Sequence, residues 1–190
     1  MATTQAYQGS WTIGTLYQSN NLFFTYVSDT AYTNLDYSAV TTIQMGSTGT
    51  ITGAVWNDYA EYRVGAEELK PGEIAYSDDE GKLHKTTERL QAFEGAVSDT
   101  YGFIIGGAKE ATVPIAVSGR VLVFPDENRS TFHAGDTVCA GANGTVSKMT
   151  REEIAQYPDR IVGVVSEIPS YKTWGSGNVA VNGRIWIRVK

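Results

Sequence analysis

The chain has 190 residues, of which 42% are hydrophobic and 19% are charged, which suffices for one domain with a sizeable core, or one domain plus an extension. The net charge of −6 at pH 7 argues against nucleic-acid binding. No apolar run approaches the roughly 18–20 residues of a membrane span, so we expect no membrane insertion. The first five residues show no basic segment followed by an apolar one, so we expect no signal peptide.

Residues 1–55 are predicted to form short β-strands joined by turns. Aromatic and β-branched residues dominate residues 11–14, 21–27, 38–44 and 49–53, and Gly, Ser and Asn separate these runs. The only charged residues of the segment are two aspartates, so its strand edges lack the charges that normally guard an edge against pairing. We therefore expect the segment to pack on the C-terminal part of the chain or on copies of itself in an oligomer.

From residue 64 onward the sequence contains an internal repeat. Four residue pairs share a spacing of 63 residues: Gly72 and Gly135, Gly81 and Gly144, Lys85 and Lys148, Thr87 and Thr150. Two further blocks match at similar spacings, namely residues 101–105 with 162–165 and residues 117–123 with 181–187. Near-constant spacing across separate blocks predicts that residues 56–190 form one duplicated domain with units at about residues 64–125 and 126–190.

Turn signals support this reading. Asn143 and Gly144 form a two-residue hairpin signal, because both residue types accept a positive φ, and residues 79–81 take that place in the first unit. Residues 113–124 and 179–189 are β-branched and partly alternating, as half-buried strands should be. The predicted fold is mainly β: an antiparallel barrel or sandwich built from two duplicated β-units, with one short helix and an N-terminal β extension.

The helix is predicted at residues 150–157. Thr150 can cap its N-terminus, Glu153 completes a capping box, and Pro158 ends it. A weaker helical turn is expected at residues 66–69.

Residues 56–62 combine two carboxylates, an amide and three large aromatic side chains. Asp58 and Glu61 are the one acidic pair with candidate chemistry, because two close carboxylates separate their pKa values and supply an acid and a base. On a helix they would share a face. On a strand they would point to opposite faces and could meet only between neighbouring chains. The alternative is a polar linker that its aromatic side chains anchor to the core.

The remaining polar residues are interpreted as architecture. Arg120 and Arg184 recur at matching positions of the repeat and could each pair with an acidic residue such as Glu73 or Asp136. The single cysteine, Cys139, and the two histidines show no metal-ligand spacing, so we expect no metal and no cofactor. Cys139 is interpreted as a small, partly buried hydrophobic residue.

Residues 54–62, with the sequence Ala-Val-Trp-Asn-Asp-Tyr-Ala-Glu-Tyr, resemble the motif that opens the C-terminal autocleavage domain of phage tail fibres and pre-neck appendages, a group classed as glutamic peptidases. The resemblance continues in residues 95–106, 114–123 and 182–187. The segment before the motif, residues 1–53, resembles the distal knob region of prophage tail fibres. The resemblance implies a trimeric fibre whose C-terminal domain assists assembly as an intramolecular chaperone and then cuts itself away.

Carried over to this sequence, the resemblance makes Asn57–Asp58 the scissile bond and makes Asp58 and Glu61 the catalytic acids of a self-cleaving peptidase with a single turnover. Cleavage of this kind needs a peptide held in place and two acid–base groups rather than a substrate pocket.

We therefore expect the distal structural or receptor-binding part of a phage or prophage tail fibre. Its expected partners are two further copies of itself in a homotrimer, other virion tail proteins, and a host cell-surface glycan. The glycan would stack on the eight aromatic residues between Tyr7 and Tyr37 or contact the loops. The protein would be made in the bacterial cytoplasm and located in the virion. The alternatives are an active intramolecular chaperone that cleaves itself at Asn57–Asp58 and a virion head-fibre or decoration protein.

Overall fold

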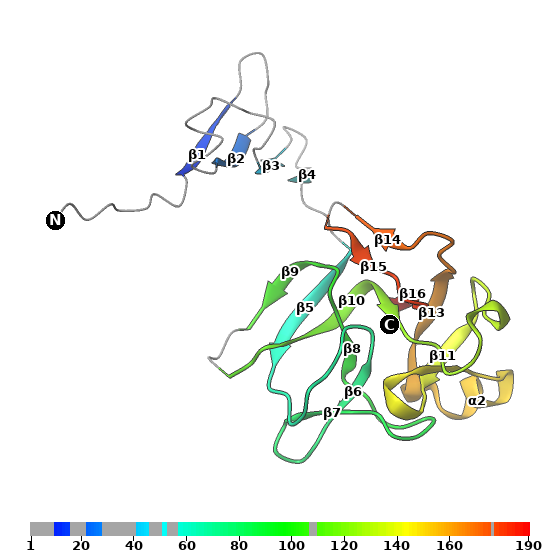
Figure 1. The fold of residues 1–190 in the computed structure, drawn as a ribbon. Helices are drawn as coiled ribbons and strands as arrows, with labels where there is room; N and C mark the ends of the chain where they lie inside the picture. The colour runs from blue at the N-terminus through cyan, green and yellow to red at the C-terminus, as the bar shows by residue number, and fades with distance from the viewer. Residues whose placement is uncertain are drawn as a thin grey trace. The chain divides into compact units, whose positions relative to one another are not determined.

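The computed structural model describes residues 57–106, 110–175 and 177–190, together with the backbone of four strands that precede them (Figure 1). The chain divides into two compact units, Met1–Ala54 and Val55–Lys190.

The first unit contains an antiparallel four-stranded sheet in the order β1-β2-β3-β4. Trp11 pairs with Tyr26 between the first two strands, and Phe24 pairs with Ile43 between the second and third. The strands predicted in this segment are confirmed as β1 (Ser10–Thr15), β2 (Leu22–Val27), β3 (Thr41–Met45) and β4 (Ile51–Thr52). The eight aromatic side chains expected to stack on a glycan lie outside the described side chains.

The second unit is built on one ten-stranded sheet that curls into a half-barrel (Figure 1). Eight strands follow the order β12-β11-β13-β16-β10-β8-β6-β7, β5 lies beside β10, and β9 joins β5 in parallel. The mainly β, antiparallel fold with one short helix is confirmed. The strands are β5 (Asp58–Arg63), β6 (Ile74–Ser77), β7 (Leu83–Lys85), β8 (Gly95–Val97), β9 (Tyr101–Ile105), β10 (Val113–Val123), β11 (Thr137–Ala140), β12 (Val146–Lys148), β13 (Ile161–Glu167) and β16 (Ile185–Val189), beside a small hairpin of β14 (Thr173–Trp174) and β15 (Val179–Ala180).

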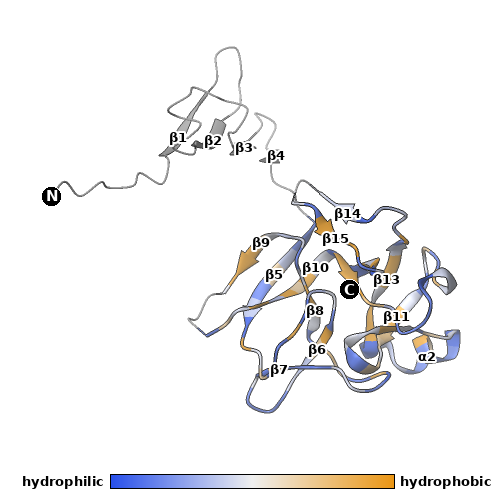
Figure 2. Cartoon of the chain, viewed as in Figure 1, coloured by the Kyte–Doolittle hydropathy of each residue, from blue (hydrophilic) through white to orange (hydrophobic). Residues whose placement is uncertain are grey.

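Apolar residues of these strands form the main buried cluster. Figure 2 shows hydrophobic stretches on several strands, such as β9, whereas β5 is partly hydrophilic. Burying each large aliphatic side chain contributes about 1.5–3 kcal/mol, so this cluster is the main source of stability. Its strand members come from β6, β8, β10, β11, β12, β13 and β16: Ile74, Ala96, Ala116, Val121, Val123, Val138, Ala140, Val146, Val162, Val165, Ile185, Ile187 and Val189. Cys139 is fully buried rather than partly buried as predicted, and it lies among the hydrophobic residues of the core.

The turns at the start of the two predicted units have the same geometry. Gly72 and Gly135 both have a φ of 96°. The acidic residue that follows each glycine forms an ion pair with the lysine at the matching position of the repeat: Glu73 with Lys85 at 3.5 Å and Asp136 with Lys148 at 3.1 Å. The sequence interpretation predicted that these two acidic residues pair with arginines, and it is therefore wrong about their partners.

The repeat is misaligned at its third block. Gly72 N donates to Val97 O at 2.8 Å, and Gly135 N donates to Val165 O, also at 2.8 Å. Val97 of β8 and Val165 of β13 thus occupy equivalent positions in the two units. The predicted match of residues 101–105 with residues 162–165 is wrong, because those first residues form β9, which pairs in parallel with β5.

The local predictions have mixed outcomes. The helix is confirmed as α2 (Arg151–Gln156): the Thr150 hydroxyl accepts from Glu153 N at 3.2 Å, and the Glu153 carboxylate accepts from Thr150 N at 2.8 Å. Asn143 and Gly144 have φ values of 56° and 72°, as their turn signal predicted. Their loop is nevertheless longer than two residues, because Gly141 N donates to Thr145 O across it. Residues 66–69 form a bend rather than a helical turn, and Ala66 N donates to Leu83 O.

Candidate functional site

Strand β5 separates the two predicted acids. Asp58 and Ala60 are buried, whereas Tyr59 between them is exposed, so successive side chains alternate between the two faces of the sheet. Asp58 and Glu61 are three residues apart and therefore point to opposite faces. The structure does not bring the two carboxylates together within one chain.

The Asn57–Asp58 peptide bond lies directly against strand β10. Asp58 is paired with Gly119 in the register, and Arg120 N donates to Asn57 O at 2.7 Å. A Cβ atom on Gly119 would lie 2.4 Å from Asn57 O, and its φ is 106°, so only glycine allows this approach. Backbone atoms of β10 therefore fix the predicted scissile bond. A hollow of about 200 Å³ opens there, lined by Asn57, Asp58, Tyr59, Ser118 and Gly119.

Asp58 is buried, with 5% of the residue exposed. The Thr100 hydroxyl donates to its Oδ1 at 2.9 Å, while Oδ2 has no hydrogen-bond partner. Burial raises the pKa of Asp58 from an ordinary 3.8 to about 6; the hydroxyls of Ser98 and Thr100 oppose this rise, and the nearby charge of Asp99 adds to it. A carboxyl group with such a pKa is able to take up and release a proton near neutral pH.

Unpaired polar atoms concentrate around this bond. Among the described side chains, the buried nitrogen and oxygen atoms without a hydrogen-bond partner are Asn57 Nδ2, Asp58 Oδ2 and Arg120 Nε. All three belong to residues that meet where β5 pairs with β10. Buried polar groups normally have partners, and exceptions are frequent where a site does chemistry. Thr100, Gly119 and Arg120 were not predicted as site residues, and nothing in the sequence near residue 58 indicated Thr100.

The two repeated arginines pair with other acids than those predicted. Arg120 forms an ion pair with Glu167 at 2.8 Å, and its guanidinium lies 4.8 Å from the centre of the Trp186 ring. Arg184 is 3% exposed on its side chain and binds both carboxylate oxygens of Asp99 at 2.9 Å. Sequence spacing could not show these partners, because they belong to strands and turns far away along the chain.

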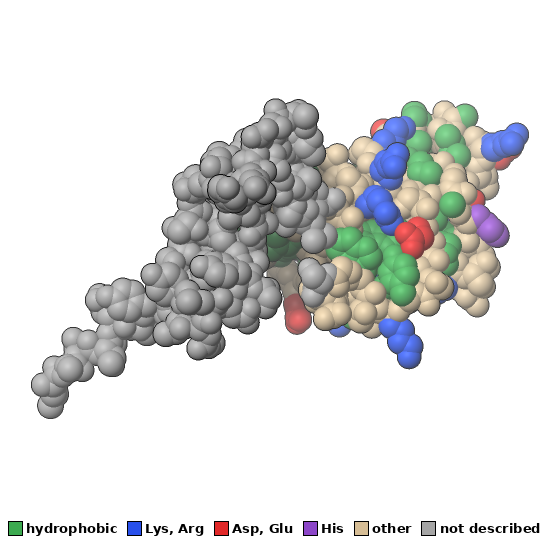
Figure 3. All heavy atoms as spheres, turned by 90° about the horizontal axis from the view of Figure 1, so that it is seen from above, with side chains coloured by type: hydrophobic (Ala, Val, Ile, Leu, Met, Phe, Trp, Pro, Cys, Tyr) green, Lys and Arg blue, Asp and Glu red, His purple; other side chains and the backbone are tan. Residues whose placement is uncertain are grey.

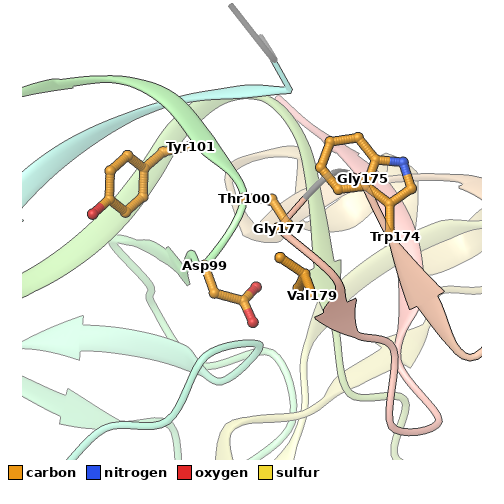
Figure 4. Close-up of a pocket in the computed structure, with 7 residues that line it drawn as sticks. All are labelled: Asp99, Thr100, Tyr101, Trp174, Gly175, Gly177 and Val179. Atoms are coloured by element: carbon orange, nitrogen blue, oxygen red, sulfur yellow. The ribbon is translucent and has the colours of Figure 1, made fainter. Parts of the chain in front are cut away.

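A second cavity, of about 150 Å³, lies between the turn after β8 and the β14–β15 hairpin. Figure 4 shows the Asp99 carboxylate and the Trp174 ring on different sides of it, with Val179 between them, and Tyr101 on the side away from Trp174. Because Arg184 already binds both Asp99 oxygens, the charged group of this cavity has a structural role.

The outer side of β5 and β9 carries exposed aromatic and aliphatic side chains. Tyr59 stacks on Phe103 with ring centres 4.8 Å apart, and Ile105 lies two residues further along β9 on the same face. Tyr101 lies on the other face, where its ring contacts Tyr62. Val117, at the bulge of β10 beside Tyr59, is 41% exposed. Five of the seven exposed large hydrophobic residues in the described part of the chain lie on these three strands. Figure 3, a space-filling view from above, shows further hydrophobic side chains at the surface between lysines and arginines.

Two further features bear on function. Within residues 57–106, 110–175 and 177–190, no three His, Cys, Asp or Glu side chains come together as a metal site requires. None of the described helices is long and apolar enough to cross a membrane.

Comparison with known proteins gives a likeness of fold. No family model matches the chain, and no curated protein matches it. Pre-mature gene product 12 of bacteriophage phi29 is similar with a TM-score of 0.50 and 15% identity, over 78% of this chain and 24% of that chain. A C-terminal fragment of the same gene product is similar with a TM-score of 0.48 and 15% identity, over 70% of this chain and 100% of the fragment. This chain spans about a quarter of the length of the pre-mature protein, and its fold is similar to that part of a phage gene product.

Proposed function

We propose that this chain is a terminal, oligomer-forming module of a phage or prophage tail appendage or fibre, located in the virion. Its fold is similar to part of gene product 12 of bacteriophage phi29, and residues 54–62 resemble the motif of self-cleaving phage fibre domains. The resemblance sets the expected number of chains at three. A head-fibre or decoration protein is the alternative, and it would bind purified capsids rather than tails.

The observation that carries the proposal is the exposed face formed by Tyr59, Phe103, Ile105 and Val117, called here the outer apolar face. Each of these residues is 39–42% exposed. Among the described strands β9 pairs with β5 alone, so it presents an edge next to this face. An apolar patch beside an open edge is a site of association between chains. A second copy fits both features, because it supplies a matching apolar face and a strand edge.

The test is the number of chains in solution, measured by light scattering after size exclusion. Ile105→Lys places a charge on the outer apolar face, and Val164→Lys does so at an exposed strand position elsewhere. We expect a trimer for the unmodified chain and for Val164→Lys, and monomers for Ile105→Lys. A monomeric unmodified chain at tens of micromolar, or equal effects of the two substitutions, would overturn the proposal.

A second function, self-cleavage at Asn57–Asp58, is favoured by the geometry of that bond. Its carbonyl oxygen accepts a hydrogen bond from Arg120 N at 2.7 Å, which stabilises negative charge on that oxygen during attack. The buried Asp58 carboxyl group is next to the leaving nitrogen and has a pKa of about 6, which suits proton transfer. The second acid, Glu61, lies on the opposite face and would have to come from a neighbouring chain.

Intact mass of the denatured protein tests self-cleavage. We expect two fragments, residues 1–57 and 58–190, that are lost in Asp58→Asn and kept in Asp79→Asn, which removes a carboxylate from an exposed turn. A single full-length mass for the unmodified chain would refute self-cleavage without affecting the oligomer proposal.

A further inference from the structure

We propose that the side chain of Asn57 itself cuts the Asn57–Asp58 bond, by attacking its own main-chain carbonyl carbon and closing a succinimide ring. This inference rests on the proposed self-cleavage and names its nucleophile. It replaces water and a second carboxylate with an amide nitrogen that the chain already holds beside the bond.

The nucleophile is the amide nitrogen Nδ2 of Asn57. It is buried and makes no hydrogen bond, whereas a buried amide nitrogen is normally held by an acceptor. Rotation about the side-chain bonds of an asparagine brings Nδ2 to the carbonyl carbon of the same residue, where the ring that closes has five members. An attack within one residue has the high effective concentration of intramolecular reactions.

The carbonyl that is attacked is prepared for negative charge. Arg120 N donates to Asn57 O at 2.7 Å, and Gly119 lies against the same oxygen, where a Cβ would approach to 2.4 Å. The pairing of β5 with β10 therefore holds the carbonyl group in place and supplies a hydrogen bond that strengthens as the oxygen becomes an anion.

Asp58 can protonate the leaving nitrogen, which is its own main-chain nitrogen. Its carboxyl group is buried, and Oδ2 has no hydrogen-bond partner. Thr100 holds the other carboxylate oxygen at 2.9 Å, which limits rotation of the carboxyl group. As this carboxyl group has a pKa of about 6, it can donate a proton to that nitrogen and take one up again within the physiological pH range.

The step balances without a further reactant. A bond forms between Asn57 Nδ2 and Asn57 C, and the bond between Asn57 C and Asp58 N breaks. Overall, one proton leaves Nδ2 and one proton reaches the new amino group of Asp58, so the Asp58 carboxyl group ends in the state in which it began. No water is consumed and no group is oxidised or reduced. The products are residues 1–57, ending in a succinimide, and residues 58–190, beginning with a free amine.

Intact mass spectrometry in heavy-oxygen water separates this route from hydrolysis. Cyclisation gives a first fragment, residues 1–57, that is lighter by one water than the hydrolysis product and that hydroxylamine traps. Hydrolysis gives the heavier fragment from the earliest time point, with heavy oxygen already in its new carboxyl group. We expect the lighter, unlabelled fragment in the unmodified full chain. This readout needs no variant and therefore does not depend on whether a variant folds.

Three variants sharpen the result. Asn57→Ala should lose cleavage, and Asn57→Gln should slow it at least about tenfold, because a six-membered ring closes less readily and the reacting atoms are misplaced. Asp79→Asn, on an exposed turn away from the bond, should cleave at an unchanged rate. Cleavage of Asn57→Ala at the unmodified rate, or early heavy-oxygen labelling, would overturn the inference while self-cleavage stands. A chain that yields no fragments would overturn both.

Discussion

Replacement of Asp58 by Asn should make the chain more stable at neutral pH and leave it nearly unchanged in acid. The substitution keeps an oxygen to accept the Thr100 hydroxyl, which donates to Oδ1 at 2.9 Å. It removes the one group that must ionise while buried in this site. Its other atom, Nδ2 in place of Oδ2, stays unpaired at every pH, so its cost is the same in acid and at neutrality.

The magnitude follows from the pKa of Asp58, which burial raises from 3.8 to about 6. Between these two values the folded chain holds a proton that the unfolded chain has released, so the free energy of unfolding falls as pH rises. At about 1.36 kcal/mol for each pH unit, the loss reaches about 3 kcal/mol above pH 6 and vanishes below pH 3.8. Asp58→Asn has no carboxyl group to ionise, so its free energy of unfolding should not fall in this way. Its stability relative to the unmodified chain should therefore rise by about 3 kcal/mol between pH 3.5 and pH 7.5.

Urea unfolding at one protein concentration, repeated from pH 3.5 to pH 7.5, measures this difference. Each sample is first checked by intact mass, so that only uncut chain enters the comparison. Asp79→Asn, on an exposed turn, is the control and should stay within about 0.5 kcal/mol of the unmodified chain throughout. If the curves of Asp58→Asn and the unmodified chain run parallel with pH, the Asp58 carboxyl group is not held neutral by burial and the reasoning fails.

Two further substitutions test the packing around the site by the same unfolding assay. Gly119→Ala should lower the free energy of unfolding by about 3 kcal/mol or more, and Gly183→Ala by about 1 kcal/mol. Both glycines have a positive φ. A Cβ on Gly119 would lie 2.4 Å from a carbonyl oxygen, whereas a Cβ on Gly183 would meet nothing within 4 Å. Equal losses would contradict the close approach of the strands. Asp99→Ala should cost about 3 kcal/mol, because it leaves the Arg184 guanidinium, 3% exposed, without its acid. Glu80→Ala, in an exposed pair, should change stability by less than about 0.5 kcal/mol, and a similar small effect of Asp99→Ala would show that its ion pair is dispensable.

Short-range signals in the sequence predicted the helix cap and the glycine turns correctly. The capping box of Thr150 and Glu153 forms as expected, because both of its hydrogen bonds join residues three positions apart. The positive φ values of Gly72 and Gly135, both 96°, follow from residue type in the same way. The first turns of the repeat could be aligned because each carries its own glycine, acid and lysine. The third block could not, since β8, β9 and β13 are all apolar strands that contain a glycine, and this composition does not say which strands pair.

The sequence also indicated where the candidate site lies, at residues 56–62, but not how it is built. Asp58 and Glu61 are close along the chain and lie on opposite faces, because β5 is a strand. The groups that surround Asp58 instead come from Thr100, 42 residues away, and from Gly119 on β10. Periodicity, caps and turns depend on neighbours within a few residues, so the sequence alone determined them. Which strands lie side by side depends on burying all the apolar faces at once, and this alone decided that Asp58 would be buried and that the Asn57–Asp58 bond would lie against a glycine.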